Sequence, residues 1–516
     1  MTSPVSGPVP GTPADSAAHR PPEPPAHEYN VGLVIGSVAT LLLLAALDQT
    51  IVSTALPTIV SDLGGLEHLS WVVTAYILAS TVAAPLYGKL GDLYGRRLMV
   101  FVSVGLFLLG SLLCGISQDM GTLIVARAVQ GLGGGGLFVL ALSVVGDVIP
   151  PKERGKIQGM FAAVFSISSM IGPLLGGWIV EQFSWHWIFL VNVPLGILAV
   201  LGFAVSFPAH TATHKHKIDW SGAAALSVAL ASITLFTALG GHSFAWVSVQ
   251  SAALLALFVA SVLAFIVIER QAAEPILPLD LFQGNVFRNT SLLSFLTGAA
   301  MLGAVTFLPL YLQVARGVTP MMSGLLLAPM TIGIIAATTV AGRYMRATGR
   351  YRILPLAGMG LLVAAALLLT RIAVDTSTLV FSAMLVLFGF ALGLCFPVLT
   401  TAAQNAVPRR VLGTATAAGV MFRQIGGSIA VALFGALMTA RLASSFGGLT
   451  VNPEMGPQQL AQLPPDARAA IATHVVDAIA PIYWIVAGLA LVGVLFALAL
   501  KEVPLGRNDA PPAPVE

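Results

Sequence analysis

The feature that most constrains this chain is a series of about fourteen apolar runs, each long enough to cross a membrane as a helix. A span needs about 20 mostly apolar residues, because the hydrocarbon layer is roughly 30 Å thick. Only 9% of the 516 residues are charged, whereas a typical soluble domain is about one-quarter charged. We therefore predict an all-α integral membrane protein. The predicted spans are 31–56, 69–88, 98–116, 121–145, 157–180, 187–207, 219–240, 249–268, 289–313, 320–341, 352–370, 377–398, 413–439 and 480–500.

Basic residues are distributed unevenly between the two sides of the predicted bundle. If the N-terminus is cytoplasmic, the outer loops hold only Arg316, Arg371, Arg441 and Arg468 of the 25 Lys and Arg residues. Cytoplasmic loops of membrane proteins carry the excess of Lys and Arg. We therefore expect a multi-pass protein of the plasma membrane with both termini cytoplasmic. The net charge of +3 then reflects orientation and does not indicate a nucleic-acid partner.

Polar segments divide the chain into two long apolar parts. Residues 1–30 and 501–516 are polar and rich in proline, and we expect disordered cytoplasmic tails there rather than a signal peptide. Residues 31–207 and 289–500 are interpreted as N-terminal and C-terminal six-helix bundles. Between them, 208–288 is a linker with the seventh and eighth spans as an inserted hairpin. Residues 440–480 form a long outer loop, with a short amphipathic helix predicted over the outer mouth.

The two halves carry related sequence patterns. GKLGDLYGRR after the second span and GRYMRATGRYR after the tenth align Gly88 with Gly342 and Gly95 with Gly349. A second pair, VIPPKERG and AVPRRVLG, places a proline five residues before a glycine in both halves. Parallel repeats of this kind are a transporter architecture, with the substrate site between the halves near the bilayer midplane. Duplication in a channel or a scaffold is the alternative.

Asp48 is the only acidic residue well inside a predicted span, in the run LLLLAALDQTIVSTALP. Intramembrane ionisable residues are candidates for functional sites by default, and burial disfavours the charged form of a carboxylate. Asp48 is therefore predicted to carry a proton and, when ionised, to attract a cationic substrate. The alternative is a structural carboxylate held by Ser, Thr or Gln neighbours.

Arg127 lies in the fourth predicted span, in LIVARAVQGLGGGG, at a depth similar to that of Asp48. A buried guanidinium needs a partner, and an acid on a neighbouring helix is one candidate; a static buried hydrogen-bond network is the alternative to a functional role. Gln130 follows a turn later on a similar face. The glycines at 133–136 are predicted to allow close helix packing, because no Gly-Lys-Ser/Thr follows them to complete a phosphate-binding loop.

Four stretches together resemble the fourteen-span drug:proton antiporters of the major facilitator superfamily. They are LDQTIVSTALPTI in the first span, GKLGDLYGRRLMV after the second, RAVQGLGGG in the fourth, and the GPLLGG of IGPLLGGWIV in the fifth, followed by WHWIFLVNVPLG. The resemblance covers nearly the whole chain apart from the tails. It implies that Asp48 and Arg127 act in proton coupling and that Asp48 recognises cationic drugs, with Gln130 as a further candidate for the substrate cavity.

The inner loop GKLGDLYGRR contains spaced glycines, an acid and two arginines. Asp92 can pair with Arg96 four residues later. The resemblance implies that Gly88, Asp92, Gly95, Arg96 and Arg97 latch the two halves in one access state. A plain basic inner loop would explain the arginines but not the glycines and the acid. In the second-half copy an arginine stands where Asp92 does, so that copy is interpreted as a basic anchor.

The fifth predicted span is rich in small residues. A proline inside a helix kinks it, and small residues three or four apart let a neighbouring helix approach closely. The resemblance associates this stretch with antiport rather than symport, and a plain packing role is the alternative. The residues concerned are Gly159, Gly172, Pro173, Gly176 and Gly177.

Arg423 and Gln424 lie near the middle of the thirteenth predicted span and complete the candidates for the substrate cavity. Arg423 either binds anionic groups and tunes the proton site, or is a structural cation held by backbone carbonyls. Cys114 and Cys395 fall inside spans, where apolar packing is expected rather than a disulfide. No metal site is expected, because the segment HTATHKHK at 210–217 lies in a basic inner loop and is interpreted as a solvated linker.

The leading interpretation is a proton-driven antiporter that exports lipophilic or cationic drugs by alternating access, and so confers antibiotic resistance. We expect a monomer in the lipid bilayer, with protons and small amphipathic compounds as its ligands. The sequence has no visible ATP site, intramembrane Ser/His/Asp set or paired acids, so we expect no enzyme activity and no cofactor, with the proton gradient as energy source. One alternative is a dedicated exporter of an endogenous product such as an antibiotic, lipid or siderophore. Another, from a different class, is a non-transporting sensor or a membrane enzyme.

Overall fold

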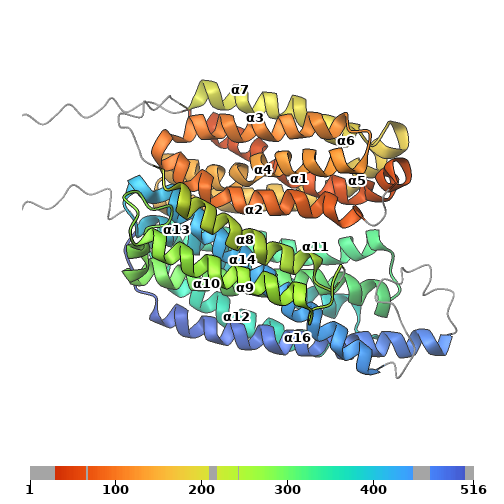
Figure 1. The fold of residues 1–516 in the computed structure, drawn as a ribbon. Helices are drawn as coiled ribbons and strands as arrows, with labels where there is room; N and C mark the ends of the chain where they lie inside the picture. The colour runs from red at the N-terminus through yellow and green to blue at the C-terminus, as the bar shows by residue number, and fades with distance from the viewer. Residues whose placement is uncertain (1–29, 65–67, 208–217, 242, 446–464, 506–516) are drawn as a thin grey trace, which may run out of the picture.

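The computed structural model describes residues 30–64, 68–207, 218–241, 243–445 and 465–505, and these ranges form a helical bundle without a β-strand (Figure 1). Residues 1–29, the segment 210–217, residues 446–464 of the outer loop and residues 506–516 therefore lie outside the described residues. The predictions made for those segments are not addressed by the structure.

The helices follow the predicted spans in order. The first half contains α1 (Val31–Leu63), α2 (Leu69–Tyr94), α3 (Arg96–Gly115), α4 (Met120–Val148), α5 (Pro151–Gln182), α6 (Trp187–Leu190) and α7 (Asn192–Ser206). Two helices follow, α8 (Trp220–Leu239) and α9 (Val249–Glu269). The second half contains α10 (Asn285–Leu310), α11 (Pro320–Thr348), α12 (Ile353–Leu369), α13 (Thr378–Asn405), α14 (Leu412–Ser445) and α16 (Pro465–Ala499), and a π-helical segment, Tyr311–Ala315, extends α10.

Twelve of the helices in the described part of the chain are long and apolar enough to cross a membrane. The predicted spans 157–180 and 352–370 are not among them. The first corresponds to α5, which is 32 residues long but has charged residues in its first turns and polar residues along its length. The second corresponds to α12, an apolar helix of only 17 residues. The predicted count of fourteen is therefore not reached by length and composition alone.

The strongest helix contacts repeat between the two halves. In the first half α2 packs on α4, α3 on α4, α1 on α5 and α1 on α7. The corresponding pairs of the second half, α11 with α13, α12 with α13, α10 with α14 and α10 with α16, are also in contact. The aligned glycines Gly95 and Gly349 both have a positive φ, 90° and 67°, which favours glycine, although their ψ angles differ. The sequence repeat thus has a structural counterpart.

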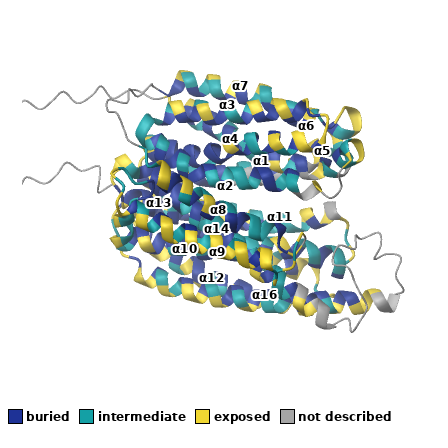
Figure 2. Ribbon diagram, in the orientation of Figure 1, coloured by how far each residue is buried: buried dark blue, intermediate teal, exposed yellow. Residues whose placement is uncertain are grey.

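Helices α8 and α9 pack on each other, and α8 also contacts α2 of the first half and α14 of the second. This pair therefore lies along the junction of the halves (Figure 1). Helix α9 exposes a series of large apolar side chains, including Leu257, Val259 and Leu263 (Figure 2). Such a surface suits contact with lipid.

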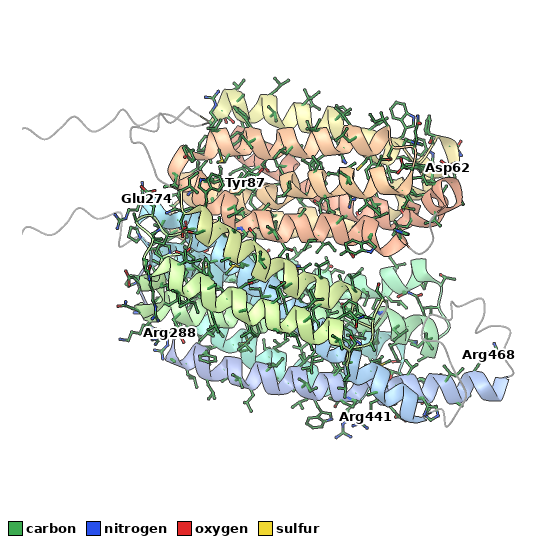
Figure 3. All side chains as sticks on the ribbon, in the orientation of Figure 1. Asp62, Tyr87, Glu274, Arg288, Arg441 and Arg468 are labelled. Atoms are coloured by element: carbon green, nitrogen blue, oxygen red, sulfur yellow. The ribbon has the colours of Figure 1, made fainter. Side chains whose placement is uncertain are left out.

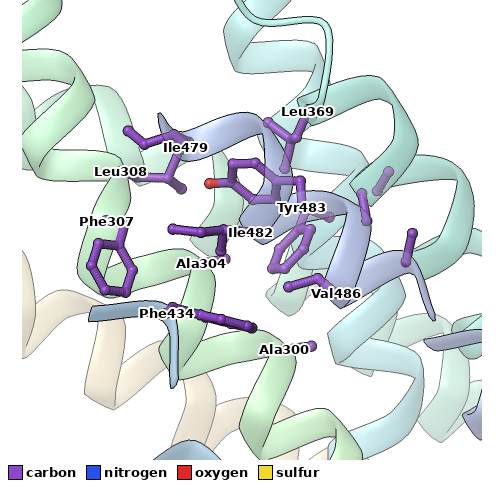
Figure 4. Close-up of a cluster of buried hydrophobic side chains, with 14 of the residues drawn as sticks. Ala300, Ala304, Phe307, Leu308, Leu369, Phe434, Ile479, Ile482, Tyr483 and Val486 are labelled. Carbon is purple, nitrogen blue, oxygen red and sulfur yellow. The ribbon is translucent and has the colours of Figure 1, made fainter. Parts of the chain in front are cut away.

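Each half has its own apolar core. The second half is centred on side chains of α10, α13, α14 and α16, among them Phe307, Phe434 and Tyr483 (Figure 4). A second large cluster joins α1, α2, α3, α4 and α7 of the first half, and includes Phe107 and Phe203. A smaller cluster of Ala84, Val139 and Ala417 joins the two halves.

The two halves meet closely at one end of the bundle, where α1 begins and α16 ends, which we call the terminal end. Figure 3 places Glu274 and Arg288 at this end, and Asp62, Arg441 and Arg468 at the opposite one. At the terminal end, a Cβ added to Gly88 of α2 would lie 2.8 Å from the carbonyl oxygen of Gly413. On the other side of the junction, a Cβ on Gly155 of α5 would lie 2.8 Å from Cα of Gly342. Both approaches require glycine.

One prediction about the outer loop is wrong. We expected a short amphipathic helix around residues 464–481, separate from the last span. Instead, these residues form the first part of α16, a single helix of 35 residues that includes Pro481. Val475, Ile479 and Ile482 are buried in the core of the second half, so the apolar face of this segment packs inside the bundle and continues the last span.

Candidate functional site

Asp48 lies inside the first half, and its side chain is fully buried, with 0% of its surface exposed. Three donors from two other helices surround its carboxylate. Arg127 Nη1 of α4 lies 2.7 Å from Oδ2, whereas Gln130 Nε2 of α4 and Asn192 Nδ2 of α7 donate to Oδ1 at 2.7 and 3.0 Å. The acid is therefore held by an ion pair and two amide hydrogen bonds in a region that solvent does not reach.

Arg127 is as completely enclosed as its partner. Besides the ion pair with Asp48, its Nη1 donates to Gln130 Oε1 at 2.6 Å and its Nε donates to the carbonyl oxygen of Val72 at 3.2 Å. The guanidinium carbon lies 4.4 Å from the ring centroid of Tyr76 and 5.7 Å from that of Phe189. A cation over aromatic faces gains electrostatic stabilisation. Each of these partners lies in the first half, so the network belongs to that half alone.

Ser111 of α3 ties the amide groups of the network together. Its hydroxyl oxygen accepts from Gln130 Nε2 at 2.7 Å and from Asn192 Nδ2 at 3.0 Å. This contact is possible because Gly110 lets α3 approach α4: a Cβ there would lie 2.3 Å from the backbone nitrogen of Gln130. Buried polar networks in which the members have partners are rigid and define one arrangement.

Asn192, Ser111 and Tyr76 are members of this site that we did not predict. Asn192 lies in the motif WHWIFLVNVPLG, at the start of α7, and is the one amide in an otherwise apolar stretch. Asn192 could therefore have been recognised from the sequence as a polar residue inside a predicted span. For Ser111 and Tyr76 the sequence carries no comparable signal, because serine and tyrosine occur elsewhere in the spans.

The glycines of α4 act as predicted, in close packing with α2 and α3. A Cβ on Gly131 would lie 2.4 Å from the carbonyl oxygen of Tyr76, and one on Gly135 would lie 2.2 Å from that of Ser80. On the other side, a Cβ on Gly133 would lie 2.2 Å from the backbone nitrogen of Phe107. These contacts draw α2 toward Arg127 and so bring its aromatic and carbonyl partners within reach.

A second cluster lies at the terminal end, where α2 of the first half meets the beginning of α14 of the second. Asp92 accepts from the backbone nitrogen of Gly413 at 2.9 Å, and from the backbone nitrogen and hydroxyl of Thr414 at 2.7 and 2.8 Å. A carboxylate at a helix N-terminus is stabilised by free backbone donors and the helix dipole. Arg96 pairs with Asp92, as predicted, and also with Asp147 of α4 at 2.9 Å.

The remaining basic residues of this region play different parts. Arg97 donates to the carbonyl oxygen of Ala204 at 3.0 Å, within the first half. The structure therefore does not place Arg97 in the contact between halves, because its side chain points toward α7. Arg346, which stands where Asp92 does in the repeat, reaches Glu153 of the first half at 3.7 Å in an exposed ion pair. It is thus a weak link between halves, in addition to a basic residue at the surface.

The glycines of α5 face three different surroundings. A Cβ on Gly172 would lie 2.0 Å from Thr50 Oγ1, and one on Gly176 would lie 2.4 Å from Thr54 Oγ1, so both allow close approach of α1. Gly159 faces the other half, since its Cβ would lie 3.0 Å from Thr338 of α11. Gly177 has open space around it, which does not support a packing role there. Pro173 lies within the unbroken helix α5.

Arg423 and Gln424 lie on α14 in the second half, away from the Asp48 network, and both are partly exposed. The Arg423 guanidinium carbon lies 4.6 Å from the ring centroid of Phe396. Among the described residues its Nε has no hydrogen-bond partner. By contrast Asp48 and Gln130, the other two cavity candidates, are both 0% exposed and are closed to a ligand in this conformation.

The site therefore places one titratable carboxylate in a fully buried network of donors. No group of three or more His, Cys, Asp or Glu side chains in the described ranges is placed to hold a metal ion. Both cysteines are buried and free, as predicted, and Cys114 Sγ lies 3.8 Å from Gln130 Oε1.

Comparison with known proteins agrees with this architecture. Residues 38–431 match the model of the Major Facilitator Superfamily. The chain is 35% identical over 517 residues to the multidrug transporter protein MdtP of Bacillus subtilis, with 93% of this chain and 94% of the relative covered. It is 40% identical over 473 residues to an uncharacterized MFS-type transporter of Mycobacterium tuberculosis, covering 90% of this chain and 68% of the relative.

A solved structure shares the fold at low sequence identity. The crystal structure of the human organic anion transporter MFSD10 (TETRAN) superposes with a TM-score of 0.61 at 16% identity. The match covers 92% of this chain and 100% of that chain. At this identity the likeness concerns the fold alone.

Proposed function

Because the chain belongs to the Major Facilitator Superfamily, we propose that this membrane transporter is a proton-coupled antiporter that exports lipophilic or cationic drugs by alternating access. The observation that carries the proposal is the complete burial of Asp48 among Arg127, Gln130 and Asn192. A carboxylate that is ionised in such a network loses its ion pair when it is protonated. Protonation therefore changes the interactions among three helices of one half, which is what coupling requires.

The proposed topology has fourteen spans, with α5 and α12 as additional crossings and α8 and α9 as an inserted hairpin. Helix α5 packs along α1 and α11, and its glycines at these contacts let the helices approach closely. The terminal end faces the cytoplasm of the cell that carries the protein in its plasma membrane. The Lys and Arg excess in the loops of that end supports this orientation.

The proposed cycle uses the contact at the terminal end as its inner gate. Asp92 joins the halves there through Gly413 and Thr414, and Arg96 pairs with Asp92 from its own half, so we take this conformation as closed to the cytoplasm. Protonation of Asp48 from the outside then favours release of substrate and return to the inward-facing state. Loss of the proton to the cytoplasm frees the transporter for the next molecule. The proton gradient is the energy source, and a monomer suffices, because each step occurs within one chain.

The experiment that tests the function measures transport in proteoliposomes. The purified full-length protein is reconstituted, the membrane potential is clamped, and the movement of a fluorescent lipophilic cation is followed with and without an imposed pH gradient. We expect accumulation against the concentration gradient only when the pH gradient is present, and collapse of that accumulation by a protonophore. Equal movement with and without the gradient, or equal movement in protein-free liposomes, would rule out proton-driven export.

A second candidate is a dedicated exporter of one endogenous product that carries an anionic group. The observation that favours it is Arg423, a partly exposed guanidinium of the second half whose Nε lacks a partner among the described residues. An unpaired cation at this depth is costly, and an anionic group of a substrate would compensate it. In this case Arg423→Gln lowers transport of a carboxylated amphipathic dye more than transport of a cationic dye. An equal effect on both dyes argues for a structural role of Arg423.

A further inference from the structure

An open cavity of about 520 Å³ lies at the terminal end, at the junction of the two halves. Its charged lining residues are Lys152 of α5, Arg350 and Arg352 of the turn between α11 and α12, and Glu502 of the segment after α16. Lys152 belongs to the first half and the other three belong to the second. The cavity is thus assembled from both halves, and it contains none of the residues of the Asp48 network.

The frame of the cavity is fixed by hydrogen bonds. Glu502 accepts from the backbone nitrogen of Tyr351 at 2.8 Å through Oε1 and from that of Arg352 at 3.2 Å through Oε2. The backbone nitrogen of Leu505 donates to the carbonyl oxygen of Gly349 at 3.0 Å. Both oxygens of the one carboxylate in the lining, that of Glu502, therefore accept hydrogen bonds from the backbone. Burial raises the pKa of Tyr351 to about 12, so its hydroxyl adds no negative charge at neutral pH.

The cations of the cavity are free to bind a ligand. In the described part of the chain, neither Lys152 nor Arg350 forms an ion pair. Lys152 extends over the turn of the other half, since its Nζ would lie 3.8 Å from a Cβ added to Gly349. Arg352 donates from Nη2 to the carbonyl oxygen of Leu498 at 2.7 Å, which orients its guanidinium. The cavity lining thus has three cations and one carboxylate, and this excess of positive charge suits an anionic ligand.

The surroundings favour an anion that also carries apolar chains. Arg352 is followed by Ile353, whose side chain is 49% exposed. Leu498, whose carbonyl oxygen accepts the hydrogen bond from Arg352, is also 49% exposed. Leu495, one turn away on α16, is 61% exposed. These side chains lie where α12 begins and α16 ends, and the proposed crossing of both helices puts the boundary between lipid headgroups and hydrocarbon at this level. Basic pockets between spans at this level bind anionic headgroups. An Arg guanidinium can donate two parallel hydrogen bonds to two oxygens of one phosphate group.

We propose that this cavity binds the phosphate group of an anionic lipid, with Lys152, Arg350 and Arg352 as ligands and the acyl chains along α12 and α16. Because Lys152 comes from the other half, the site is complete only while the halves are packed together at the terminal end. A bound lipid therefore stabilises that conformation. This consequence rests on the proposed alternating access, but the binding itself does not.

The test counts lipids on the full-length protein by native mass spectrometry. Delipidated protein is incubated with mixed micelles of phosphatidylcholine, with or without phosphatidylglycerol. The test variant carries Lys152→Gln and Arg350→Gln. The control carries Lys156→Gln and Arg343→Gln, which remove the same charge from exposed positions of α5 and α11 at the same end. We expect phosphatidylglycerol binding to weaken about tenfold or more in the test variant, because each cation near a lipid surface contributes roughly a factor of five. Binding should remain in the control.

Three results would overturn the proposal. Equal binding by the wild type and both variants would mean that these cations do not bind the lipid. Equal loss in both variants would mean that only the general charge of the surface attracts it. A separate titration with inorganic phosphate distinguishes the source of the phosphate group. Binding of phosphate to wild-type protein but not to the test variant, without specific retention of phosphatidylglycerol, would assign the cavity to free phosphate instead. None of these measurements involves transport, so their failure is distinct from failure of the proposed antiport.

Discussion

Asp48 of α1 and Arg127 of α4 form an ion pair of 2.7 Å inside the first half, and neither side chain is more than 2% exposed. Breaking a buried ion pair by removing one partner costs about 3–5 kcal/mol, because the other charge remains buried and uncompensated. The two residues are therefore energetically coupled, and each determines what a substitution of the other does.

We predict that Arg127→Met lowers the thermal stability of the purified protein strongly, by about 3–5 kcal/mol, because it leaves Asp48 as a lone buried charge. The double variant Asp48→Asn with Arg127→Met removes that charge and should recover a large part of the loss. Thermal unfolding of the wild type, both single variants and the double variant measures the coupling. Additive losses in the double variant would contradict the ion pair.

Asp92 is predicted to hold the terminal end closed, whereas Arg346 is not. Asp92 accepts three hydrogen bonds from Gly413 and Thr414 across the junction, whereas the Arg346 ion pair with Glu153 is exposed and worth at most about 1 kcal/mol. Spin labels on the exposed residues Lys156 and Arg288 report the distance between the halves at this end. Asp92→Ala should shift the distribution to longer distances and Arg346→Ala should leave it nearly unchanged; similar distributions for both variants count against the assignment.

Adjacent glycines of α5 provide a matched pair for the packing of α1. Gly176→Ala places a methyl group against Thr54 and the carbonyl oxygen of Ile51, whereas Gly177→Ala places one in open space. Overpacking costs typically about 1–3 kcal/mol. We expect a lower unfolding temperature and slower transport for Gly176→Ala, with Gly177→Ala close to the wild type. The same loss in both variants would mean that helix flexibility, and not the contact with α1, is what the glycines supply.

Asn192→Ala is predicted to impair the site although the motif gave Asn192 no role. The substitution removes a donor to Asp48 and leaves Ser111 with one amide partner fewer, and an unmet buried group costs about 1–3 kcal/mol. Transport driven by a pH gradient should fall several-fold. The control is Asn289→Ala, since Asn289 Nδ2 donates only to the carbonyl oxygen of Asn285, four residues earlier in its own helix. Equal transport by the two variants would mean that Asn192 has no role in transport.

The sequence indicated the two charged members of the site because charges inside apolar runs are conspicuous. Asp48 and Arg127 each stand alone in a span, and a buried charge requires a partner. Asn192 and Ser111 were missed because neutral polar side chains are common in spans, and their role depends on how α3 and α7 pack beside α4. That packing follows from glycines such as Gly110, whose contact partner cannot be read from one segment.

The fold was predictable where apolar length decides the outcome and less so where packing decides it. Helices α3 and α9 match their predicted spans because a long apolar run has few alternatives. Helix α5 falls short of a span by composition, because charged residues occupy its first turns and glycines form its contacts with α1 and α11. The amphipathic segment after Pro465 was assigned to a separate helix, because its continuation into α16 depends on burial of Ile479 and Ile482 in the core of the second half.

The measurement that tests the central claim most directly compares wild-type protein with Asp48→Asn in proteoliposomes that contain a fluorescent lipophilic cation. Asp119→Asn is the matched control, because Asp119 is an exposed cap at the start of α4. The account predicts that Asp48→Asn abolishes accumulation driven by the pH gradient but retains exchange of the cation down its own gradient. Asp119→Asn should leave both activities unchanged. Undiminished gradient-driven accumulation by Asp48→Asn would place the coupling site elsewhere in the molecule.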